Sequence, residues 1–329
     1  MRTRVRFMAP LAVAVALTAA CGQSGSSGGG GGGNNAASGQ ACAPVADQKL
    51  VMLEDDKHLQ TVDNIVPAVS AQAAQANPAM LGALNSVSAV LTTDDLVKLN
   101  AAVDLERKSA VDVAAGYVAD KGLGQGASGG SGAVTVGGAN FTESQILANV
   151  YADVLNKAGF TATVQSVGNR EAYLPALQRN EIQAFPEYVG TLTEFLDANE
   201  ERAVASGDLD ATMKALRDLA TANGLTVGEP AQAADQNAFA ITKAQSDKLG
   251  GVTTLSGLAD KCKDGSLVLG AVPECPTRPF CQPGLQSTYG LKFASVQDFD
   301  LGGPTNQALQ QGVVSIGLVL STDPIFAQG

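Results

Sequence analysis

The alternation of short apolar strands with amphipathic helices over residues 133–192 constrains the fold more than any other feature of the chain. A strand at Val134 runs into the pair Gly137–Gly138, and Thr142 can then cap a helix. The apolar residues of this helix recur at helical spacing: Ile146, Leu147, Val150, Val154 and Leu155. Next come an expected strand at 161–167, a helix at 169–178 and a strand at 182–185. This order indicates a parallel sheet, which binds ligands at the carboxyl ends of its strands.

The rest of the chain continues the alternation. Later residues predict helices at 190–198, 209–223, 254–260, 283–289 and 304–311, and strands at 225–227, 237–241, 267–269, 293–296 and 313–320. Earlier residues predict a strand at 49–53 and helices at 65–75, 78–90, 94–104 and 109–121. A chain of 329 residues is long enough for two lobes of ordinary domain size. The expected fold class is therefore α/β, with two lobes and a cleft between them.

The first 21 residues have the pattern of an export signal. Arg2, Arg4 and Arg6 form a basic start, and the apolar stretch after them is too short to span a bilayer. Leu17 to Cys21 (LTAAC) resembles a bacterial lipobox, which predicts a lipidated Cys21 after cleavage; ordinary signal cleavage is the alternative. Residues 22–44 then form a flexible Gly/Ser tether, of which the first twenty residues span roughly 25 Å.

The charge of the chain argues against a nucleic-acid partner. Loss of the three leader arginines would change the net charge from −11 to −14, because the leader contains no acidic residue. Nucleic-acid-binding domains are usually basic, and their positive charge supplies most of their affinity. The acidity is compatible with an extracytoplasmic protein but identifies no ligand.

Four of the five cysteines follow the proposed lipidation site. An even number in an exported chain suggests two disulfides, for which three pairings are possible. The short separation of Cys275 and Cys281 favours their pairing, which would leave Cys42 with Cys262. A zinc site is the competing use, but the chain has no CxxC motif and its only histidine is His58. We therefore expect no metal.

An enzyme is not expected from this sequence. A Ser/His/Asp or Cys/His arrangement would depend on His58, which follows an acidic turn and has no nucleophile motif beside it. The glycine runs lack the surroundings of a phosphate-binding loop, so no nucleotide cofactor is expected. The carboxylates of Glu54, Asp55 and Asp56 are better explained as a solvated turn than as catalytic acids or calcium ligands. A binding protein without a cofactor remains.

Four segments of the chain carry a family resemblance. GGANFTESQILANVYADVLNKAGF, NREAYLPALQRNEIQAFPEYVGT, VLSTD and LVMLEDDKHLQTVDNIVP resemble the substrate-binding proteins of glycine betaine/choline/carnitine ABC importers. The resemblance implies a two-lobed periplasmic-binding-protein fold of type II and a role in osmoprotection. It also implies a small zwitterionic or cationic solute and an ABC permease as partners, and a monomer held outside the cell membrane by Cys21. The alternatives are a non-betaine solute on the same fold, or a sensory or scaffolding lipoprotein without transport.

The order of these segments differs from the family pattern and resembles a circular permutation. In the family STD runs directly into LVxLEDDK and a helical tail, whereas here Leu50 to Lys57 lies near the start and Ser321 to Asp323 near the end. Permutation is tolerated where the original termini lie close together, so residue 329 should lie close to residue 48. The expected parts are a segment at 45–123 that completes lobe 1, a linker at 124–132, the main part of lobe 1 at 133–235, lobe 2 at 236–320 and a return segment at 321–329 toward lobe 1.

The resemblance also assigns candidate ligand-binding residues. A quaternary ammonium cannot donate a hydrogen bond, so its site surrounds the methyl groups with aromatic faces. The first cage tyrosine of the family falls on Tyr188, with Thr191 as a hydroxyl donor, and the second on Phe239, near Asn237. The arginine that pairs with the ligand carboxylate in some members best matches Arg278.

This chain departs from the family cage at three positions. Leu320 and Val62 replace frequent aromatic residues, and Ala139 replaces a frequent lysine. The loss of two walls, at about 0.5–2 kcal/mol for each cation–π contact, would weaken binding of a betaine by one to a few orders of magnitude. We therefore expect either low affinity or a different ligand.

The remaining candidates have both a binding and a structural interpretation. Those kept in the ligand-binding set are Asn140, Thr142, Tyr173, Asn306 and Asn64. Asn140 and Thr142 can cap a helix, although a helix N-terminus that faces a cleft also attracts a carboxylate. For Asp63, Asn64, Thr322 and Asp323 we prefer hinge and capping roles, because their motifs flank the crossover between lobes in the family.

Overall fold

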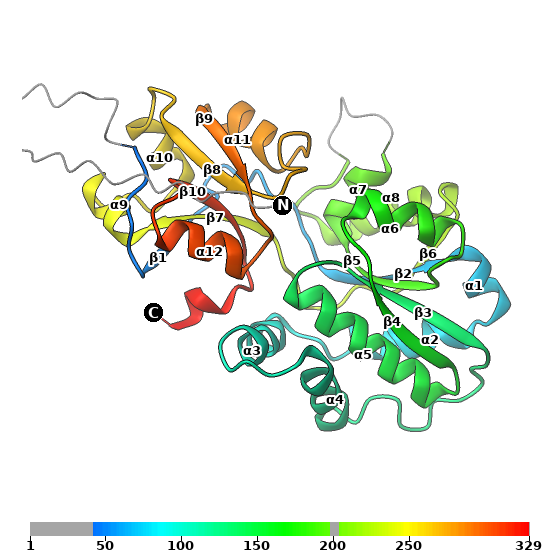
Figure 1. Ribbon diagram of the computed structural model, residues 1–329. Helices are drawn as coiled ribbons and strands as arrows, with labels where there is room; N and C mark the ends of the chain where they lie inside the picture. The colour runs from blue at the N-terminus through cyan, green and yellow to red at the C-terminus, as the bar shows by residue number, and fades with distance from the viewer. Residues whose placement is uncertain (1–41, 198–203, 329) are drawn as a thin grey trace, which may run out of the picture. The chain divides into compact units, whose positions relative to one another are not determined.

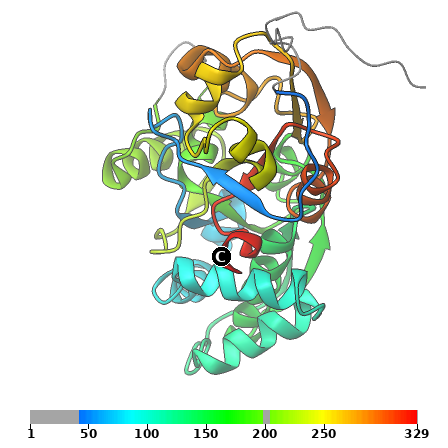
Figure 2. The ribbon, with the colours of Figure 1, turned by 90° about the vertical axis from the view of Figure 1, so that its left-hand side faces the viewer.

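The computed structural model describes residues 42–197 and 204–328, and the figures show it from two directions (Figures 1 and 2). The predictions for the leader, for Cys21 and for the tether before residue 42 lie outside this part. The residues in these two ranges belong to one compact unit. Within the described ranges, none of the helices combines the length and the apolar character needed to cross a bilayer.

The first sheet is the core of lobe 1 and has the strand order β4-β3-β5-β2-β6. Its strands are β2 (Ile65–Ser70), β3 (Ala133–Gly138), β4 (Thr161–Ser166), β5 (Ala184–Tyr188) and β6 (Leu225–Val227). β3 is parallel to β4 and β5, whereas β2 is antiparallel to β5 and β6. The carboxyl ends of β3, β4 and β5 therefore meet at one edge of the sheet.

Helices cover both faces of this sheet (Figure 1). They are α1 (Ala71–Ala76), α2 (Ala79–Ser88), α3 (Thr93–Asp104), α4 (Ala110–Asp120), α5 (Thr142–Ala158), α6 (Arg170–Gln178), α7 (Val189–Leu196) and α8 (Leu209–Ala222). Residues of α2, α3, α4 and α5 pack in one core cluster with Ile65 and Val69 of β2. Residues of α6, α7 and α8 pack in another with Val66 and Ala68. β2 thus points its side chains alternately into two cores, as a central strand does.

The prediction of a helix over residues 65–75 is wrong, because this stretch begins with a buried strand. Ile65 to Ser70 form β2, and only then does the short helix α1 follow. β-branched residues favour a strand, and Pro67 would break the interior of a helix. In β2 the backbone of Pro67 faces Pro186 of β5 and accepts a hydrogen bond from Gly228 N (2.8 Å). A proline is tolerated there because its missing N–H is not needed.

The second sheet is the core of lobe 2 and has the strand order β1-β7-β10-β8-β9. Its strands are β1 (Leu50–Leu53), β7 (Asn237–Thr242), β8 (Leu267–Ala271), β9 (Phe293–Asp298) and β10 (Ile316–Leu320). The helices around it are α9 (Lys243–Lys248), α10 (Leu255–Lys261), α11 (Gln282–Tyr289) and α12 (Gly303–Gln310). β8 is parallel to β9 and β10, and β7 is antiparallel to β1 and β10. The sum is an α/β fold with two sheets, as in two-lobed periplasmic binding proteins.

The sequence predicts residues 45–123 in lobe 1, but the structure divides them between the two sheets. β1 pairs with β7 and so belongs to the second sheet, whereas β2 and the helices α1 to α4 belong to the first. β1 and β10 flank β7 on its two sides, which brings strands from the two ends of the chain into one sheet. The 3₁₀ helix η2 (Pro324–Gln328) follows β10 and lies between β1 and α3 (Figure 2). Leu50 and Phe326 pack against the same small core cluster.

Two chain segments cross between the sheets and are hydrogen-bonded side by side. Residues 54–64 lead from β1 to β2, and residues 228–236 lead from β6 to β7. Asp235 N donates to Asp63 O (3.0 Å), and the Asn64 amide donates to Ala231 O (2.9 Å). Gly190 of α7 permits close approach here, because a Cβ at this position would lie 2.3 Å from Thr61 Oγ1 and Val62 O. We call residues 61–64 and 234–236 the hinge.

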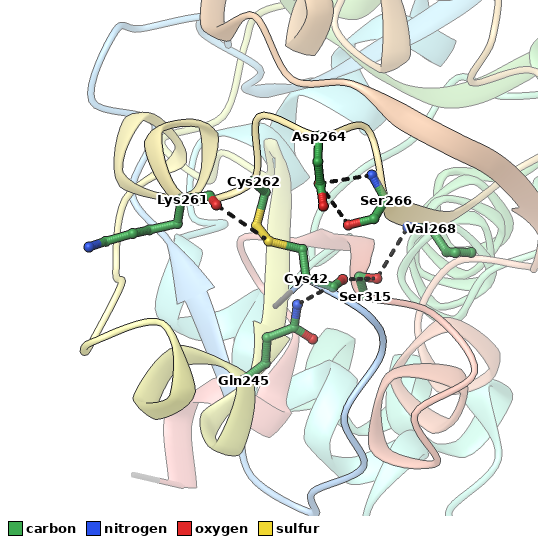
Figure 3. Close-up of a disulfide and its surroundings, with 8 residues drawn as sticks. All are labelled: Cys42, Gln245, Lys261, Cys262, Asp264, Ser266, Val268 and Ser315. Atoms are coloured by element: carbon green, nitrogen blue, oxygen red, sulfur yellow. Dashed lines mark hydrogen bonds between the residues drawn. A yellow bond between two sulfur atoms is a disulfide. The ribbon is translucent and has the colours of Figure 1, made fainter. Parts of the chain in front are cut away.

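Both favoured disulfides are present, and the predicted pairing is confirmed. Cys275 pairs with Cys281, and Cys42 pairs with Cys262 across 220 residues of sequence. Around the second bond, Ser315 Oγ donates to the carbonyl oxygen of Cys42 (2.9 Å) and accepts from Val268 N (3.2 Å) (Figure 3). The disulfide thus fixes the first described residue to the carboxyl end of α10.

Candidate functional site

A pocket of about 300 Å³ lies where the carboxyl ends of strands from both sheets meet. Lobe 1 contributes Ala139, Asn140, Phe141, Gly168, Asn169, Arg170, Tyr173, Phe185 and Tyr188. Lobe 2 contributes Val272, Pro273, Glu274, Arg278, Asp300 and Leu301. These residues follow β3, β4, β8 and β9 or lie on β5, as the rule for parallel sheets predicts. The volume is at the small end of the range for ligand pockets and therefore suits a small solute.

Aromatic rings form the lobe 1 wall of this pocket. Phe141 and Tyr188 lie with their ring centroids 6.4 Å apart at an interplanar angle of 33°. Tyr173 stacks on Phe185 behind them, with centroids 3.7 Å apart. In the described part of the chain, none of the lobe 2 residues that line the pocket is aromatic. The aromatic surface is therefore one-sided.

A buried ion pair supports the aromatic wall. Arg170 donates from Nε and Nη2 to the Glu187 carboxylate (3.0 and 2.8 Å), and the Tyr173 hydroxyl donates to the same carboxylate (2.7 Å). Burial would lower the pKa of Arg170, but the Glu187 charge and hydrogen bonds raise it well above its ordinary value. The Glu187 carboxylate binds both Arg170 and the Tyr173 hydroxyl, so the ion pair holds Tyr173 and the start of α6 in place.

Polar contacts connect the two lobes across the pocket. Arg278 Nη2 donates to both oxygens of Glu171 (3.1 and 3.0 Å), and the Asn169 amide donates to Glu274. Arg278 Nε is buried without a hydrogen-bond partner in the described part of the chain. The loop that carries Glu274 and Arg278 is closed by the Cys275–Cys281 disulfide. One edge of the guanidinium therefore holds the lobes together at the wall of the pocket.

A buried carboxyl at the hinge supports the helix that follows the wall. Asp63 accepts hydrogen bonds from Thr191 N (2.9 Å) and from the Thr191 hydroxyl. Burial raises the pKa of Asp63 to about 7, although the Thr191 hydrogen bonds and the Arg170 charge act in the opposite direction. Thr191 thus connects α7 to the hinge. It does not line the pocket.

Four of the candidate residues lie together at the pocket: Tyr188, Arg278, Asn140 and Tyr173. Tyr188 is nevertheless buried, and its hydroxyl donates to Glu143 (2.9 Å). Asn140 accepts from Ser166 Oγ (3.1 Å) at the end of β4. Tyr188 lies on β5 and Asn140 follows β3, whereas Tyr173 lies on α6 and Arg278 in the disulfide loop after β8.

The other candidates lie elsewhere. Phe239 is 1% exposed in β7, where it packs in the core of lobe 2, because the alternation of the strand points it inward. Asn237 lies at the start of the same strand. The Asn64 amide in the hinge donates to Ala231 O of the other crossing segment. Thr142 donates to Asp104 (2.6 Å), and Asn306 donates to Asp323 (2.6 Å). These contacts are structural and do not bring these residues to the pocket.

Several pocket residues were not predicted. Phe141 is the third residue after the glycine pair, and Asn169 and Arg170 begin α6 shortly after β4. All three residues could have been predicted from their positions after the carboxyl ends of the strands expected there. Glu274, Asp300 and Leu301 follow β8 and β9 in the same way. By contrast, the aromatic losses at Val62 and Leu320 lie away from this pocket, whereas Ala139 lines it.

A second, much smaller cavity of about 20 Å³ adjoins the first and shares Phe141 and Leu301 with it. It is lined by polar side chains from α3, α5 and the segment after β10, among them Asn100, Glu143 and Thr322. Over residues 42–197 and 204–328, no group of three or more histidine, cysteine or acidic residues is placed to hold a metal ion.

A family model matches most of the chain. Residues 42–120 and 132–328 match the family described as the substrate binding domain of ABC-type glycine betaine transport systems. A glycine-betaine-binding protein from Pseudomonas aeruginosa is 27% identical over 176 residues, which are 51% of this chain and 55% of that protein. The chain thus spans about half the length of this curated relative. A crystal structure of a glycine betaine/carnitine/choline ABC transporter protein aligns with 59% of this chain and 71% of its own, at 20% identity and a TM-score of 0.38.

Proposed function

Because this chain belongs to the family of substrate-binding domains of ABC-type glycine betaine transport systems, we propose that it is an extracytoplasmic receptor for a small quaternary ammonium or related zwitterion. The solute binds in the pocket between the two sheets and is delivered to a membrane permease. Closure of the lobes follows from the higher affinity of the closed form for the solute. No bond is made or broken.

The observation that carries this proposal is an aromatic corner on one wall of the pocket and a guanidinium group on the opposite wall. Phe141 and Tyr188 offer π faces to a trimethylammonium group, which cannot donate a hydrogen bond. On the opposite wall, the Arg278 guanidinium lines the pocket and offers donors to the carboxylate of a betaine. The two features lie on different lobes, so a zwitterion that satisfies both connects them and stabilises the closed form.

The one-sided aromatic wall sets an expectation for affinity. Each cation–π contact contributes about 0.5–2 kcal/mol, so two rings in place of a full cage reduce the affinity for glycine betaine by about one to two orders of magnitude. Phe239 supplies no further wall because it is in the core of lobe 2.

Calorimetric titration of the purified protein with glycine betaine, choline, carnitine and proline betaine tests this function. We expect binding of at least one of them, with a loss of about tenfold in Phe141→Ala and in Arg278→Gln. Phe239→Leu is the matched aromatic control and should leave the affinity unchanged. Binding of none of these solutes, or an equal loss in the control, would refute the assignment of ligand class and site.

A second ligand class, zwitterions with a protonated primary or secondary amine, is favoured by the acidic side chains of lobe 2. Glu274 and Asp300 line the pocket opposite the aromatic wall. Their carboxylates accept hydrogen bonds, which an amino acid ammonium can donate and a quaternary ammonium cannot. Proline against proline betaine is the discriminating pair, because the two differ in N-methylation. Tighter binding of proline would select this second class.

We further propose that Cys21 carries the lipid anchor of this receptor. The lipobox-like sequence LTAAC and the basic start support it. Cells expressing the chain and given a labelled fatty acid should incorporate label that Cys21→Ser abolishes. Labelled betaine uptake that falls on deletion of the gene and returns with the wild-type chain would establish transport; unchanged uptake would favour a sensory or scaffolding role.

We also propose that the chain is a circular permutation of its family. Its support is that the family match falls into two stretches, and that β1 and β10 flank β7 in one sheet. A chain rebuilt as residues 133–328 followed by 42–123 restores the family order and keeps Cys42 for its bond with Cys262. We expect it to fold with a melting temperature within about 5 °C of the native order and to bind the same solutes. A rebuilt chain that fails to fold while the native order does would contradict the proposal.

A further inference from the structure

Two acidic side chains meet behind the pocket wall at the place where lobe 1, the hinge and the end of β10 come together. Glu143 lies in the first turn of α5 and is 1% exposed, and Asp235 lies in the hinge and is 2% exposed. Thr322 links them, because its hydroxyl donates to Glu143 (2.8 Å) and its backbone N donates to Asp235 (3.1 Å). An ionised carboxylate only accepts hydrogen bonds, so a direct hydrogen bond between the two acids requires a proton on one of them.

The other contacts show which one carries it. Glu143 accepts from the Tyr188 hydroxyl at Oε1 (2.9 Å), and from the Asn100 amide (3.0 Å) and the Thr322 hydroxyl (2.8 Å) at Oε2. Donors on both oxygens favour the ionised form of Glu143. Asp235 accepts from Thr322 N and Ser321 Oγ (both 3.1 Å) at Oδ1 only. Asp235 Oδ2 is buried and has no hydrogen-bond partner among the residues of the structure, so it is the atom that can hold the proton.

The charged groups that the structure describes around the pair include no free positive charge that could compensate a second carboxylate. From β5 come Tyr188 and Glu187, and the latter is paired with Arg170. The hinge contributes the buried acid Asp63, which receives a hydrogen bond from the Asp235 backbone. The segment after β10 contributes Asp323, which accepts from Asn306, and α3 contributes Asp104, which accepts from Thr142. With acids on every neighbouring element, a second negative charge in the pair would be unfavourable.

The direction of the pKa changes agrees with this assignment. Burial, and then the negative charge of Glu143, raise the pKa of Asp235 well above its ordinary value. Burial also raises the pKa of Glu143, but the Asn100, Thr322 and Tyr188 donors oppose that rise. Burial holds the Tyr188 hydroxyl in its protonated, donating form.

We infer that protonated Asp235 donates from Oδ2 to Glu143, and that this shared proton is the contact that positions Tyr188 in the pocket wall and fixes the hinge to α5. Asp235 and Glu143 are thus positioning residues, since neither lines the pocket in which the solute would bind. Loss of the proton would place two carboxylates side by side, and the Thr322 and Tyr188 contacts would loosen. Solute binding and stability should therefore both weaken as pH rises. The part of this inference that concerns solute binding rests on the proposed function; the part that concerns stability does not.

Paired isosteric variants test the assignment. Asp235→Asn places an amide nitrogen where the proton lies and keeps an acceptor for Thr322 and Ser321, so it imitates the protonated acid at every pH. Glu143→Gln places an amide nitrogen against the donors of Tyr188, Asn100 or Thr322. We expect Asp235→Asn to be tolerated and Glu143→Gln to lower the melting temperature by about 5 °C or more. The reverse order would overturn the assignment of the proton.

The pH profile separates positioning from simple packing. Melting temperatures measured by circular dichroism from pH 4 to 9 should fall with pH in the wild type, and less steeply in Asp235→Asn. Asp298→Asn, an exposed acid on β9, changes the same charge and should keep the wild-type slope. An unchanged slope in Asp235→Asn, or an equal flattening in Asp298→Asn, would refute the shared proton.

Solute affinity is the second readout. With a bound solute from the calorimetric panel, the dissociation constant of the wild type should increase about tenfold between pH 5 and pH 9, and Asp235→Asn should remove most of that change. If no panel solute binds, the proposed ligand fails while the melting profiles still decide the question of the proton. If a solute binds and its affinity has the same pH dependence in both proteins, Tyr188 is not held through this pair.

Discussion

Arg278 in the disulfide loop of lobe 2 donates through Nη2 to both carboxylate oxygens of Glu171 in lobe 1, at 3.1 and 3.0 Å. This pair spans the mouth of the pocket, and the Glu171 side chain remains 40% exposed. Such a pair contributes little to overall stability in water, but it acts only when the lobes are close together.

Glu171→Gln should therefore shift the balance toward the open form. We expect a two- to fivefold loss of solute affinity, on the scale of about 0.5–1 kcal/mol for a partly exposed pair, and a nearly unchanged melting temperature. Calorimetry and small-angle scattering without solute measure the two effects. Glu181→Gln is the control, because Glu181 forms an exposed pair with Arg179 within lobe 1. An affinity loss in the control equal to that in Glu171→Gln would show that the interlobe contact is not the cause.

Asp63 makes its own pH-dependent contribution to the stability of the fold. Its folded pKa of about 7 lies above the ordinary 3.8, so the protonated form stabilises the fold. That stability is complete below about pH 4 and is lost as pH rises through about 7, by at most about 4 kcal/mol. Asp63→Asn should flatten this part of the melting profile, because an amide can donate to the Thr191 hydroxyl. A wild-type profile that rises between pH 5 and 8 would contradict the prediction.

The two disulfides should have different effects when they are removed. Cys275→Ser/Cys281→Ser opens a short loop and should cost about 2 kcal/mol, but it frees Glu274 and Arg278 and so should also weaken solute binding. Cys42→Ser/Cys262→Ser opens a separation of 220 residues and should cost about 5 kcal/mol in the loop-entropy description. Its effect on affinity should be small, since both cysteines lie away from the pocket. Urea unfolding and calorimetry on the same samples measure both quantities, and equal affinity losses would contradict the distinction.

Gly190 should not tolerate a side chain. A Cβ there would lie 2.3 Å from Thr61 Oγ1 and Val62 O, so Gly190→Ala must move α7 away from the hinge. We expect a destabilisation of about 2 kcal/mol or more, with reduced solute affinity. Gly82→Ala in α2 is the matched control, because its Cβ would meet no atom within 4 Å and alanine favours a helix by about 1 kcal/mol. Equal unfolding midpoints for the two variants would show that the hinge contact is unimportant.

The sequence predicted the parts of the fold in which local pattern and tertiary environment agree. In α5, Ile146, Leu147 and Val150 face the core at the expected spacing, and Gly159 at φ 107° ends the helix. The prediction for residues 65–70 was wrong because β2 is buried on both faces and precedes an alanine-rich helix. A strand without polar alternation cannot be distinguished from a buried helix by periodicity.

The site was predictable to the extent that it follows from strand ends. Tyr188 and Arg278 were found through the family motifs, and Phe141 and Asn169 could have been found from their positions after β3 and β4. Phe239 was misplaced because a motif gives a position in the chain but not the face of the strand on which it lies. The pair Glu143 and Asp235 could not have been foreseen, since it depends on three segments that are far apart in the sequence.

The bond between Cys42 and Cys262 also determines how the molecule would respond to mechanical force. A pull applied at residue 42 passes through the sulfur atoms directly into residue 262 and does not stretch the 220-residue ring between them. All strands of the first sheet and both crossing segments lie inside that ring. A force applied at the amino-terminal side would therefore act on lobe 2, and the chain of lobe 1 would not lie in its path.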